Sequence, residues 1–190
     1  MGEVEETRRR IVAAAYACMA RDGIASTTLD ATAREAGVAR ATVYRYFPGG
    51  RDELIAAAVT DQVAAFFARL REDVGDPQDV TALLERGLVA GRRRLAEHEV
   101  LQHVLQVEAD RLVPQLASVM PIVMGVLRDE IAARLVRERL RPGVAVGEAA
   151  DLLARMMLSF MGTSGCWDLD DPAEVRRLVR GQLLAGVLAD

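Results

Sequence analysis

The sequence contains no lysine and no asparagine, so all 24 of its basic residues are arginines. We interpret this bias as codon usage in a GC-rich genome rather than as a functional signal. Aromatic residues make up only 4% of the chain, which disfavours an all-β fold, because strands are rich in aromatic and β-branched side chains. Alanine, leucine, arginine and glutamate are abundant instead, so the composition favours helices.

Cysteine is equally scarce, since only Cys18 and Cys166 are present. Two cysteines so far apart form no disulfide framework, and free thiols are typical of a reducing cytosol. No stretch of 18 uncharged apolar residues occurs, so we expect no membrane-spanning helix and no membrane partner. The first ten residues, MGEVEETRRR, lack the apolar segment of a signal peptide. We therefore expect a globular cytoplasmic protein.

The few residues that could support enzyme chemistry are poorly placed for it. His98 and His103, the only histidines, lie in HEVLQH, which is one residue too long for the zinc motif H-E-x-x-H. Their rings point about 140° apart around a helix and cannot bind one metal. Cys166 has no histidine near it in the sequence. We expect no catalytic residue, no metal site and no cofactor.

Helical periodicity extends along the whole chain. Apolar residues recur at three- and four-residue spacing, and proline- or glycine-containing segments interrupt them. We predict an all-α fold of about nine helices and no strand, with a kink near Pro121. The expected helices span residues 7–21, about 26–37, 39–47, 52 to about 74, 80–95, 99–111, 115–139, 146–162 and 172–188.

The second and third of these helices carry a helix-turn-helix pattern. Ala33, Gly37 and Val43 have the spacing of a small contact residue, a turn glycine and an apolar anchor. The net charge of −4 gives no global attraction to nucleic acid, so a DNA-binding surface would have to be local. The segment GVARATVYRYF provides one, because it contains two arginines and no acid.

A helical wheel divides this segment into two faces. Val43 and Phe47 share the face expected to enter the core. The outward front is small, hydroxylated and positive, and a tyrosine flanks it on each side. A tyrosine in such a place can rest its ring on the protein while its hydroxyl group donates to a phosphate oxygen. The outward residues are Ala41, Thr42 and Arg45, and the flanking ones are Tyr44 and Tyr46.

Residues 7–60 resemble the N-terminal DNA-binding domain of the TetR (tetracycline repressor) family of transcriptional regulators. The resemblance implies a helix-turn-helix DNA-binding domain at residues 1–51. It also implies a helical ligand-binding and dimerisation domain at residues 52–190. It rests on the Thr27-Thr28 pair, the Ala36-Gly37-Val38 turn, Thr42, Val43-Tyr44, Tyr46-Phe47 and a basic residue before Leu54.

The resemblance also assigns roles by position. Contacts to DNA phosphates fall on Thr27 or Thr28, Thr42, Tyr44, Tyr46 and Arg51, and base contacts fall on Arg40, Ala41 and Thr42. The wheel turns Arg45 outward, so Arg40 and Arg45 are both candidates for the main base contact, with Arg40 preferred. The chain departs from the family at Thr32, where a large aliphatic residue is usual, and in the longer turn PGGR.

The larger domain is expected to hold an effector and to dimerise. Methionines can form an adaptable apolar pocket wall, and a few polar groups can orient a ligand. We expect the pocket at Phe67, His103, Glu108, Arg111, Met120, Met124 and Met156. The resemblance implies a four-helix homodimer interface, which we expect at Leu152, Leu153, Met156, Met157, Phe160, Val175, Leu178, Val179, Leu183 and Val187.

The resemblance therefore implies a homodimeric repressor that binds a palindromic operator in double-stranded DNA and is released by a small-molecule effector. An activator, or a regulator that responds to no small molecule, has the same sequence features. A helical small-molecule-binding protein with a vestigial helix-turn-helix is a further alternative. The sequence does not identify the effector, the operator or the regulated genes.

Overall fold

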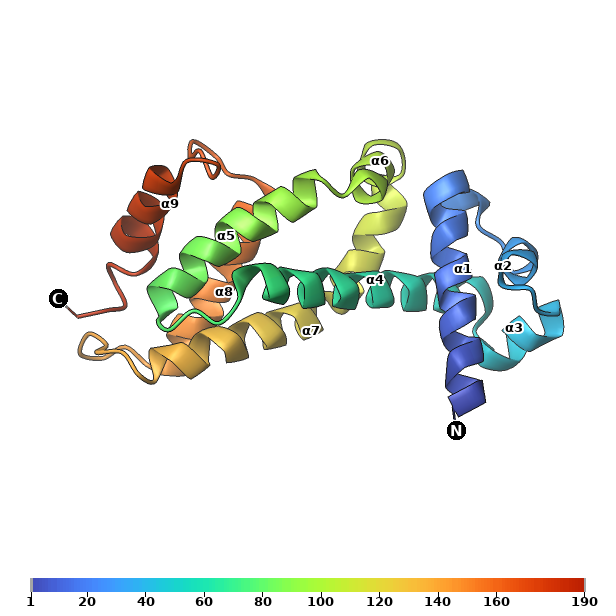
Figure 1. The fold of residues 1–190 in the computed structure, drawn as a ribbon, viewed down its shortest axis with the longest axis horizontal. Helices are drawn as coiled ribbons and strands as arrows, with labels where there is room; N and C mark the ends of the chain where they lie inside the picture. Colours follow the sequence, from blue (N-terminus) through green and yellow to red (C-terminus); the bar gives the residue numbers. More distant parts are fainter. Residues whose placement is uncertain (1, 190) are drawn as a thin grey trace. The chain divides into compact units, whose positions relative to one another are not determined.

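A computed structural model describes residues 2–189 of the chain, and helices dominate it (Figure 1). Within those residues the one β-type pairing is an isolated antiparallel bridge between Leu140 and Leu188. The predicted all-α fold is confirmed. The helices are α1 (Gly2–Ser26), α2 (Leu29–Ala36), α3 (Arg40–Tyr46), α4 (Gly50–Val74), α5 (Val80–Ala96), α6 (Glu99–Val107), α7 (Ala109–Leu135), α8 (Val146–Gly162), α9 (Pro172–Leu178) and the π-helical turn Val179–Leu183.

Several helix boundaries differ from the sequence prediction, among them those of α1, which is Gly2–Ser26 rather than 7–21. The break expected after residue 111 lies at Glu108, whose carbonyl oxygen accepts from the amides of Arg111 and Leu112 at 3.0 and 3.1 Å and so begins α7. Helix α7 then continues through Pro114 and Pro121. The last predicted helix, 172–188, ends early, because the chain leaves α-helical geometry after Leu178.

The chain forms two compact units, which differ from the predicted division at residue 51. Unit 1 is the chain up to Phe66 together with Glu99–Val119, and unit 2 is Phe67–His98 together with the chain from Met120 onward. Helices α4 and α7 therefore contribute to both units. The assignment of DNA binding and ligand binding to residues 1–51 and 52–190 stays a prediction about function.

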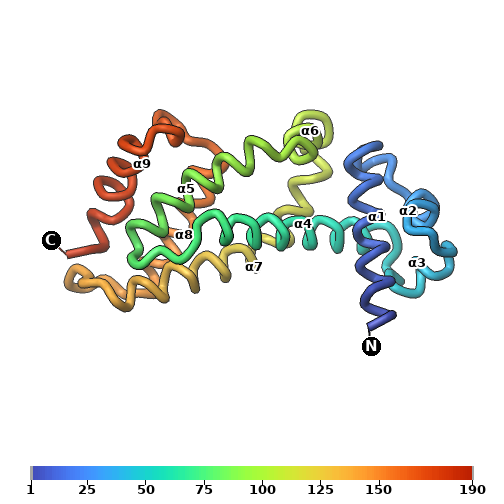
Figure 2. Tube along the Cα trace, viewed as in Figure 1, coloured from blue at the N-terminus to red at the C-terminus, as the bar shows by residue number. Residues whose placement is uncertain are grey.

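Unit 1 places the helix-turn-helix on a small apolar core. Helix α1 packs against α2, and α2 packs against α3 (Figures 1 and 2). The core contains Ile11, Val43, Phe47 and Leu54, each no more than 1% exposed. Burying an apolar side chain of this size contributes about 1.5–3 kcal/mol, so these residues fix where the outer face of α3 lies.

Unit 2 has its own core, in which α5 packs against α8 and α9. Leu84 and Leu88 of α5, Leu153 of α8 and Leu178 of α9 are completely buried there. The two cysteines are free thiols in different environments: Cys18 of α1 is buried, whereas Cys166, between α8 and α9, is exposed. None of the described helices is long and apolar enough to cross a membrane.

Candidate nucleic-acid interface and pocket

The turn between α2 and α3 has the geometry of a helix-turn-helix. The Thr28 hydroxyl oxygen caps α2 by accepting from the Ala31 amide at 3.1 Å. Gly37 ends α2 with φ of 64°, and its N–H donates to the carbonyl oxygens of Ala33 and Arg34. Because a positive φ strains other residues, the glycine expected in the turn has a direct structural reason.

Helix α3 presents a basic face with no acid in its first turn. Val43 and Phe47 point into the core of unit 1, as the wheel predicts, and are 0% and 1% exposed. The other residues of α3 that were expected to touch DNA remain accessible on the outer side. Arg40, Ala41, Tyr44 and Arg45 are exposed, and Thr42 and Tyr46 are partly buried.

The two candidate base contacts differ in their surroundings. Nη1 of Arg40 donates to Oδ2 of Asp30 at 3.1 Å, and its guanidinium carbon lies 5.6 Å from the centre of the Tyr44 ring. A hydrogen bond to Tyr44 and the charge of Asp30 raise the pKa of the Arg40 guanidinium. Arg45 stacks on Tyr46 at 5.3 Å, and no ion pair within residues 2–189 holds it. Among the described residues, Arg40 is therefore paired with an acid, whereas Arg45 is not.

Arg51, expected to bind a phosphate, is directed instead at the backbone before α2. Its guanidinium donates to the carbonyl oxygens of Thr27 at 2.7 Å, Ala25 at 3.3 Å and Ile24. Thr27 is also turned inward, since it is 1% exposed and its hydroxyl donates to the Gly23 carbonyl at 2.8 Å. Of the threonine pair, only Thr28 is exposed.

Glu108 binds the same backbone segment through the segment's amide groups, whereas Arg51 binds the carbonyl oxygens. Its carboxylate accepts from the amides of Ile24 at 2.5 Å and Ala25 at 3.1 Å. A side chain at Gly23 would lie about 3.0 Å from this carboxylate, and the φ of Gly23 is 82°. Residues 23–27 comprise the end of α1, beyond its non-helical kink at Gly23, and Thr27. We call them the α1–α2 loop. They are thus fixed by an arginine on their carbonyl oxygens and a glutamate on their amides.

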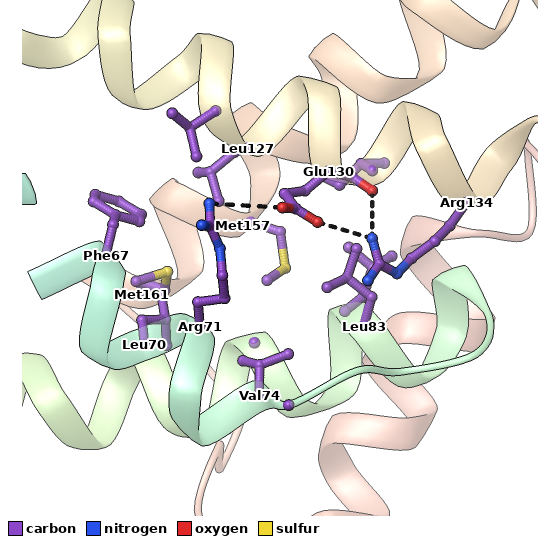
Figure 3. Close-up of a pocket in the computed structure, with 15 residues that line it drawn as sticks. Phe67, Leu70, Arg71, Val74, Leu83, Leu127, Glu130, Arg134, Met157 and Met161 are labelled. Atoms are coloured by element: carbon purple, nitrogen blue, oxygen red, sulfur yellow. Dashed lines mark hydrogen bonds and ion pairs between the residues drawn. The ribbon is translucent and has the colours of Figure 1, made fainter.

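Unit 2 contains a pocket formed by α4, α5, α7 and α8 (Figure 3). All but three of its fifteen lining residues are uncharged, and they include Phe67, Leu127, Met157 and Met161. The cavity is about 80 Å³ and opens to solvent. The three charged lining residues are Arg71, Glu130 and Arg134, which meet along one side of the pocket.

Comparison with known proteins agrees with the helix-turn-helix geometry. Residues 11–58 match the family model described as "Bacterial regulatory proteins, tetR family". An HTH-type transcriptional regulator of Mycobacterium bovis is 32% identical over 166 residues, which cover 87% of this chain and 84% of the relative. The chain belongs to the TetR family of transcriptional regulators. Members of this family bind DNA and are not enzymes.

The TetR fold extends over nearly the whole chain. The Salmonella enterica protein GusR has a TM-score of 0.62 at 21% identity, covering 96% of this chain and 95% of its own. The complex of SmeT with triclosan has a TM-score of 0.59 at 26% identity, covering 97% and 93%. The SrpR regulator of Pseudomonas putida is 43% identical over 60 residues, which cover 32% of this chain and 28% of SrpR.

Most of the residues expected in the effector pocket lie elsewhere in this TetR-family chain. Phe67 lines the pocket, but Met120, Met124 and Met156 of unit 2 do not. His103, Glu108 and Arg111 belong to unit 1, where Glu108 binds the α1–α2 loop. The pocket of unit 2 therefore does not support these six positions, and their assignment to an effector site stays a prediction. Helical periodicity does not reveal which side of a methionine-bearing helix faces a cavity.

The residues expected at the dimer interface divide into buried and accessible ones within the single chain. Seven of these residues lie in the core of unit 2 and are no more than 5% exposed, so a second chain could not reach them. They are Leu153, Met157, Val175, Leu178, Val179, Leu183 and Val187. Three residues remain accessible on α8: Leu152 is 54% exposed, and Met156 and Phe160 are partly buried. Their four-residue spacing places them along one side of the helix.

Sequence reasoning missed three groups that matter at these sites. Asp30 stands in the first turn of α2, and no local signal points to Arg40, ten residues away. Arg71 stands in the last turn of α4, where nothing in the neighbouring sequence points to a pocket. The Glu130 and Arg134 pair had a signal that could have been used, because residues four apart on a helix can pair.

Proposed function

We propose that this TetR-family regulator is a homodimeric repressor that binds a palindromic operator and is released by a small-molecule effector. The observation that carries the DNA-binding part is the outer face of α3. It is acid-free and exposes Arg40, Tyr44 and Arg45 above the buried anchors Val43 and Phe47. DNA-binding proteins of this type place such a helix in the major groove, so the protein would act in the cytoplasm, where bacterial DNA lies.

In this proposal the residues divide into base contacts and phosphate contacts. Arg40 or Arg45 donates two hydrogen bonds to a guanine, which is the commonest specific contact in the major groove, and Ala41 and Thr42 approach neighbouring base edges. Tyr44, Tyr46, Thr42 and the exposed Thr28 contact phosphates, which fix orientation without reading sequence. Arg51 holds the α1–α2 loop rather than a phosphate, because its donors already bind carbonyl oxygens.

Dimerisation and effector release are supported by different observations. The accessible stripe of Leu152, Met156 and Phe160 on α8 is the surface we assign to a second copy. Two-fold symmetry would then set the two recognition helices about 34–36 Å apart, one turn of DNA.

SmeT, named as the repressor of a multidrug efflux pump, has been solved with triclosan. The triclosan complex of SmeT supports a small-molecule effector for the pocket of unit 2. To act as an inducer, an effector must bind the DNA-incompetent state more tightly than the DNA-competent state.

The test is DNA binding by single variants, measured by fluorescence anisotropy on DNA from upstream of the gene and on unrelated DNA. We expect Arg40→Ala to weaken specific binding about ten- to a hundredfold and to relax the preference at one base pair. Tyr46→Phe should weaken both DNAs by the same factor, because a phosphate contact is not sequence-specific.

Arg45→Ala is the companion variant that decides between the two arginines. If Arg45→Ala, and not Arg40→Ala, relaxes one base position, the base contact belongs to Arg45. The DNA-binding proposal fails if neither arginine variant nor Tyr46→Phe changes affinity for either DNA. A wild-type affinity that does not fall with rising salt would also contradict it, because phosphate contacts release counterions.

A further inference from the structure

The pocket of unit 2 has an apolar interior and a charged side, and one cation on the charged side is only loosely paired. Arg71 of α4 and Arg134 of α7 lie on either side of the Glu130 carboxylate (Figure 3). Arg134 also lies 3.7 Å from Oδ1 of Asp76, which stands outside the lining, so both carboxylates lie close to Arg134, whereas Arg71 has only Glu130 at a longer distance. In an otherwise apolar pocket, a cation without a close partner favours an anionic ligand, because opposite charges attract each other more strongly where the surroundings are less polar.

Arg134 is not the group that could bind a ligand. Its side chain is only 14% exposed. Its Nη1 donates to the Glu130 carbonyl oxygen at 3.0 Å and to Oε2 of Glu130 at 2.9 Å, and its Nε donates to the Pro77 carbonyl oxygen at 3.2 Å. A guanidinium held by three acceptors in a fixed plane stabilises the local structure and has few donors left.

Arg71, in contrast to Arg134, is exposed and only weakly paired. Its side chain is 66% exposed, and it approaches Oε1 of Glu130 at 3.6 Å, too far for a hydrogen bond. Figure 3 shows its guanidinium reaching across the pocket toward Glu130 and Leu127. The planar guanidinium has five N–H donors that match the geometry of a carboxylate in pairs. Arg71 is therefore the cation of the pocket that can accept a new partner at little cost.

The other residues that line the pocket are mostly apolar, so they favour a ligand whose main part is also apolar. Met157 and Met161 of α8 face α5, where Gly87 lacks the Cβ that would lie 2.8 Å from the Met157 methyl group. Methionine side chains adapt their shape to different apolar partners. The pocket therefore combines an adjustable apolar wall with one available guanidinium.

We propose that this pocket binds a hydrophobic monocarboxylic acid, whose carboxylate pairs with Arg71 and whose apolar body packs against Met157 and Met161. The inference rests on the proposed function, in which the same pocket holds the effector, and it names the chemical class. A neutral molecule with the same apolar part forms no ion pair with Arg71, and the guanidinium stays hydrated. An amine is repelled by Arg71 and finds the Glu130 carboxylate already held by Arg134.

Isothermal titration calorimetry with matched probes tests the ligand class. The probes are decanoate, 4-butylbenzoate, methyl decanoate and decylamine, all below their aggregation concentrations. We expect at least one acid to bind ten times more tightly than methyl decanoate, and decylamine to bind most weakly. Equal affinity for acid and ester, tighter binding of the amine, or binding of neither acid would overturn the proposal.

Paired variants of the same helix test the role of Arg71. Arg71→Gln should lower the affinity for the acid at least tenfold and leave that for methyl decanoate unchanged. Arg69→Gln, an exposed arginine of α4 outside the pocket, should change neither affinity. Acid binding that survives in Arg71→Gln would contradict the proposal. The thermal unfolding midpoint of Arg71→Gln should equal that of the wild type, which shows that the variant is folded.

A DNA-release arm separates this inference from the proposed function. The acid is titrated into the protein–DNA complex in the anisotropy assay. Acid that binds through Arg71 without releasing DNA leaves the ligand class intact and contradicts induction by that ligand. Release of DNA by a neutral or cationic compound, with no acid binding, contradicts the ligand class and leaves the repressor proposal intact.

Discussion

Both units contain an arginine and a glutamate that make defined interactions, but the partners of these side chains differ between the units. In unit 1, Arg51 and Glu108 do not pair with each other, and each binds the backbone of the α1–α2 loop. In unit 2, Arg134 and Glu130 bind each other, and Arg71 is only loosely attached at 3.6 Å. Charged groups that satisfy backbone atoms fix a geometry, whereas a loosely paired cation can exchange one partner for another.

Removing one arginine from each unit tests most directly whether the two arginines differ in this way. Arg51→Ala leaves three carbonyl oxygens without their donor, and hydrogen bonds to a charged group contribute about 1.5–3 kcal/mol. We expect Arg51→Ala to lower the free energy of unfolding, measured by urea denaturation, by about 2–3 kcal/mol. It should also weaken binding to all DNA sequences, because α2 loses the support of the loop before it.

Arg71→Ala is the matched control in unit 2. An exposed ion pair at this distance contributes about 0–1 kcal/mol, so we expect little change in the unfolding curve. Similar losses of stability for Arg51→Ala and Arg71→Ala would show that the two arginines do not differ in the way described.

A second prediction concerns a polar group that unit 1 leaves unsatisfied. Thr32 of α2 is completely buried, and its hydroxyl has no hydrogen-bond partner in the described structure. A buried hydroxyl without a partner costs about 1–3 kcal/mol. Thr32→Val keeps the shape and removes the hydroxyl, so we expect the free energy of unfolding to rise by about 1 kcal/mol in urea denaturation.

Thr28→Val supplies a control of opposite sign. Thr28 caps α2 through its hydroxyl oxygen, and loss of such a cap costs about 0.5–2 kcal/mol. The same chemical change should therefore stabilise the protein at position 32 and destabilise it at position 28. Destabilisation by both changes would mean that the Thr32 hydroxyl has a partner in solution.

The smallest expected effect tests the pairing on the DNA-facing side of unit 1. Asp30 pairs with Arg40 and adds a negative charge beside a surface proposed to meet phosphates. We expect Asp30→Asn to tighten DNA binding about two- to fivefold at low salt, with a smaller gain at high salt, because exposed charges are screened. The measurement is anisotropy at several salt concentrations.

Glu35→Gln is the control for this change, since Glu35 is also an acid of α2 but pairs with Arg21 instead. Its removal should not alter DNA binding through Arg40. Equal gains from Asp30→Asn and Glu35→Gln would show that only net charge matters and that the Arg40 pairing has no specific effect.

The sequence was informative about the helix-turn-helix because its determinants are local. The cap at Thr28 acts three residues along the chain, and Gly37 is required by a single positive φ. Val43 and Phe47 were assigned to the core by helical periodicity alone, and both are buried. Signals of this kind are contained within one or two helical turns, so they can be read without knowing the tertiary structure.

The sequence was uninformative wherever a distant partner decides the outcome. Glu108 binds the amide of Ile24, which is 84 positions away, so its role could not be inferred from neighbouring residues. Periodicity shows which face of a helix is apolar but not what covers that face. Leu178 and Leu152 were therefore both expected at an interface, although the first is completely buried in unit 2 and the second is 54% exposed.

A related reason explains why most residues expected at the effector site do not line the pocket of unit 2. Met156 was expected to line the pocket, whereas its neighbour Met157 does so. Adjacent residues on a helix point about 100° apart, so an error of one position moves a side chain to a different environment. The identity of the correct methionine depends on how α8 is rotated against α5, which only the packed structure reveals.

The contrast between the two cysteines gives the native protein a built-in attachment point for spectroscopy. A thiol-reactive spin label or fluorophore can reach the exposed Cys166 but not the buried Cys18, so the wild-type chain can be labelled at one position without mutation. Two labelled copies in the proposed homodimer would report a single inter-label distance by pulsed electron paramagnetic resonance. Recording that distance with and without DNA or a carboxylic acid would follow rearrangement of the dimer directly.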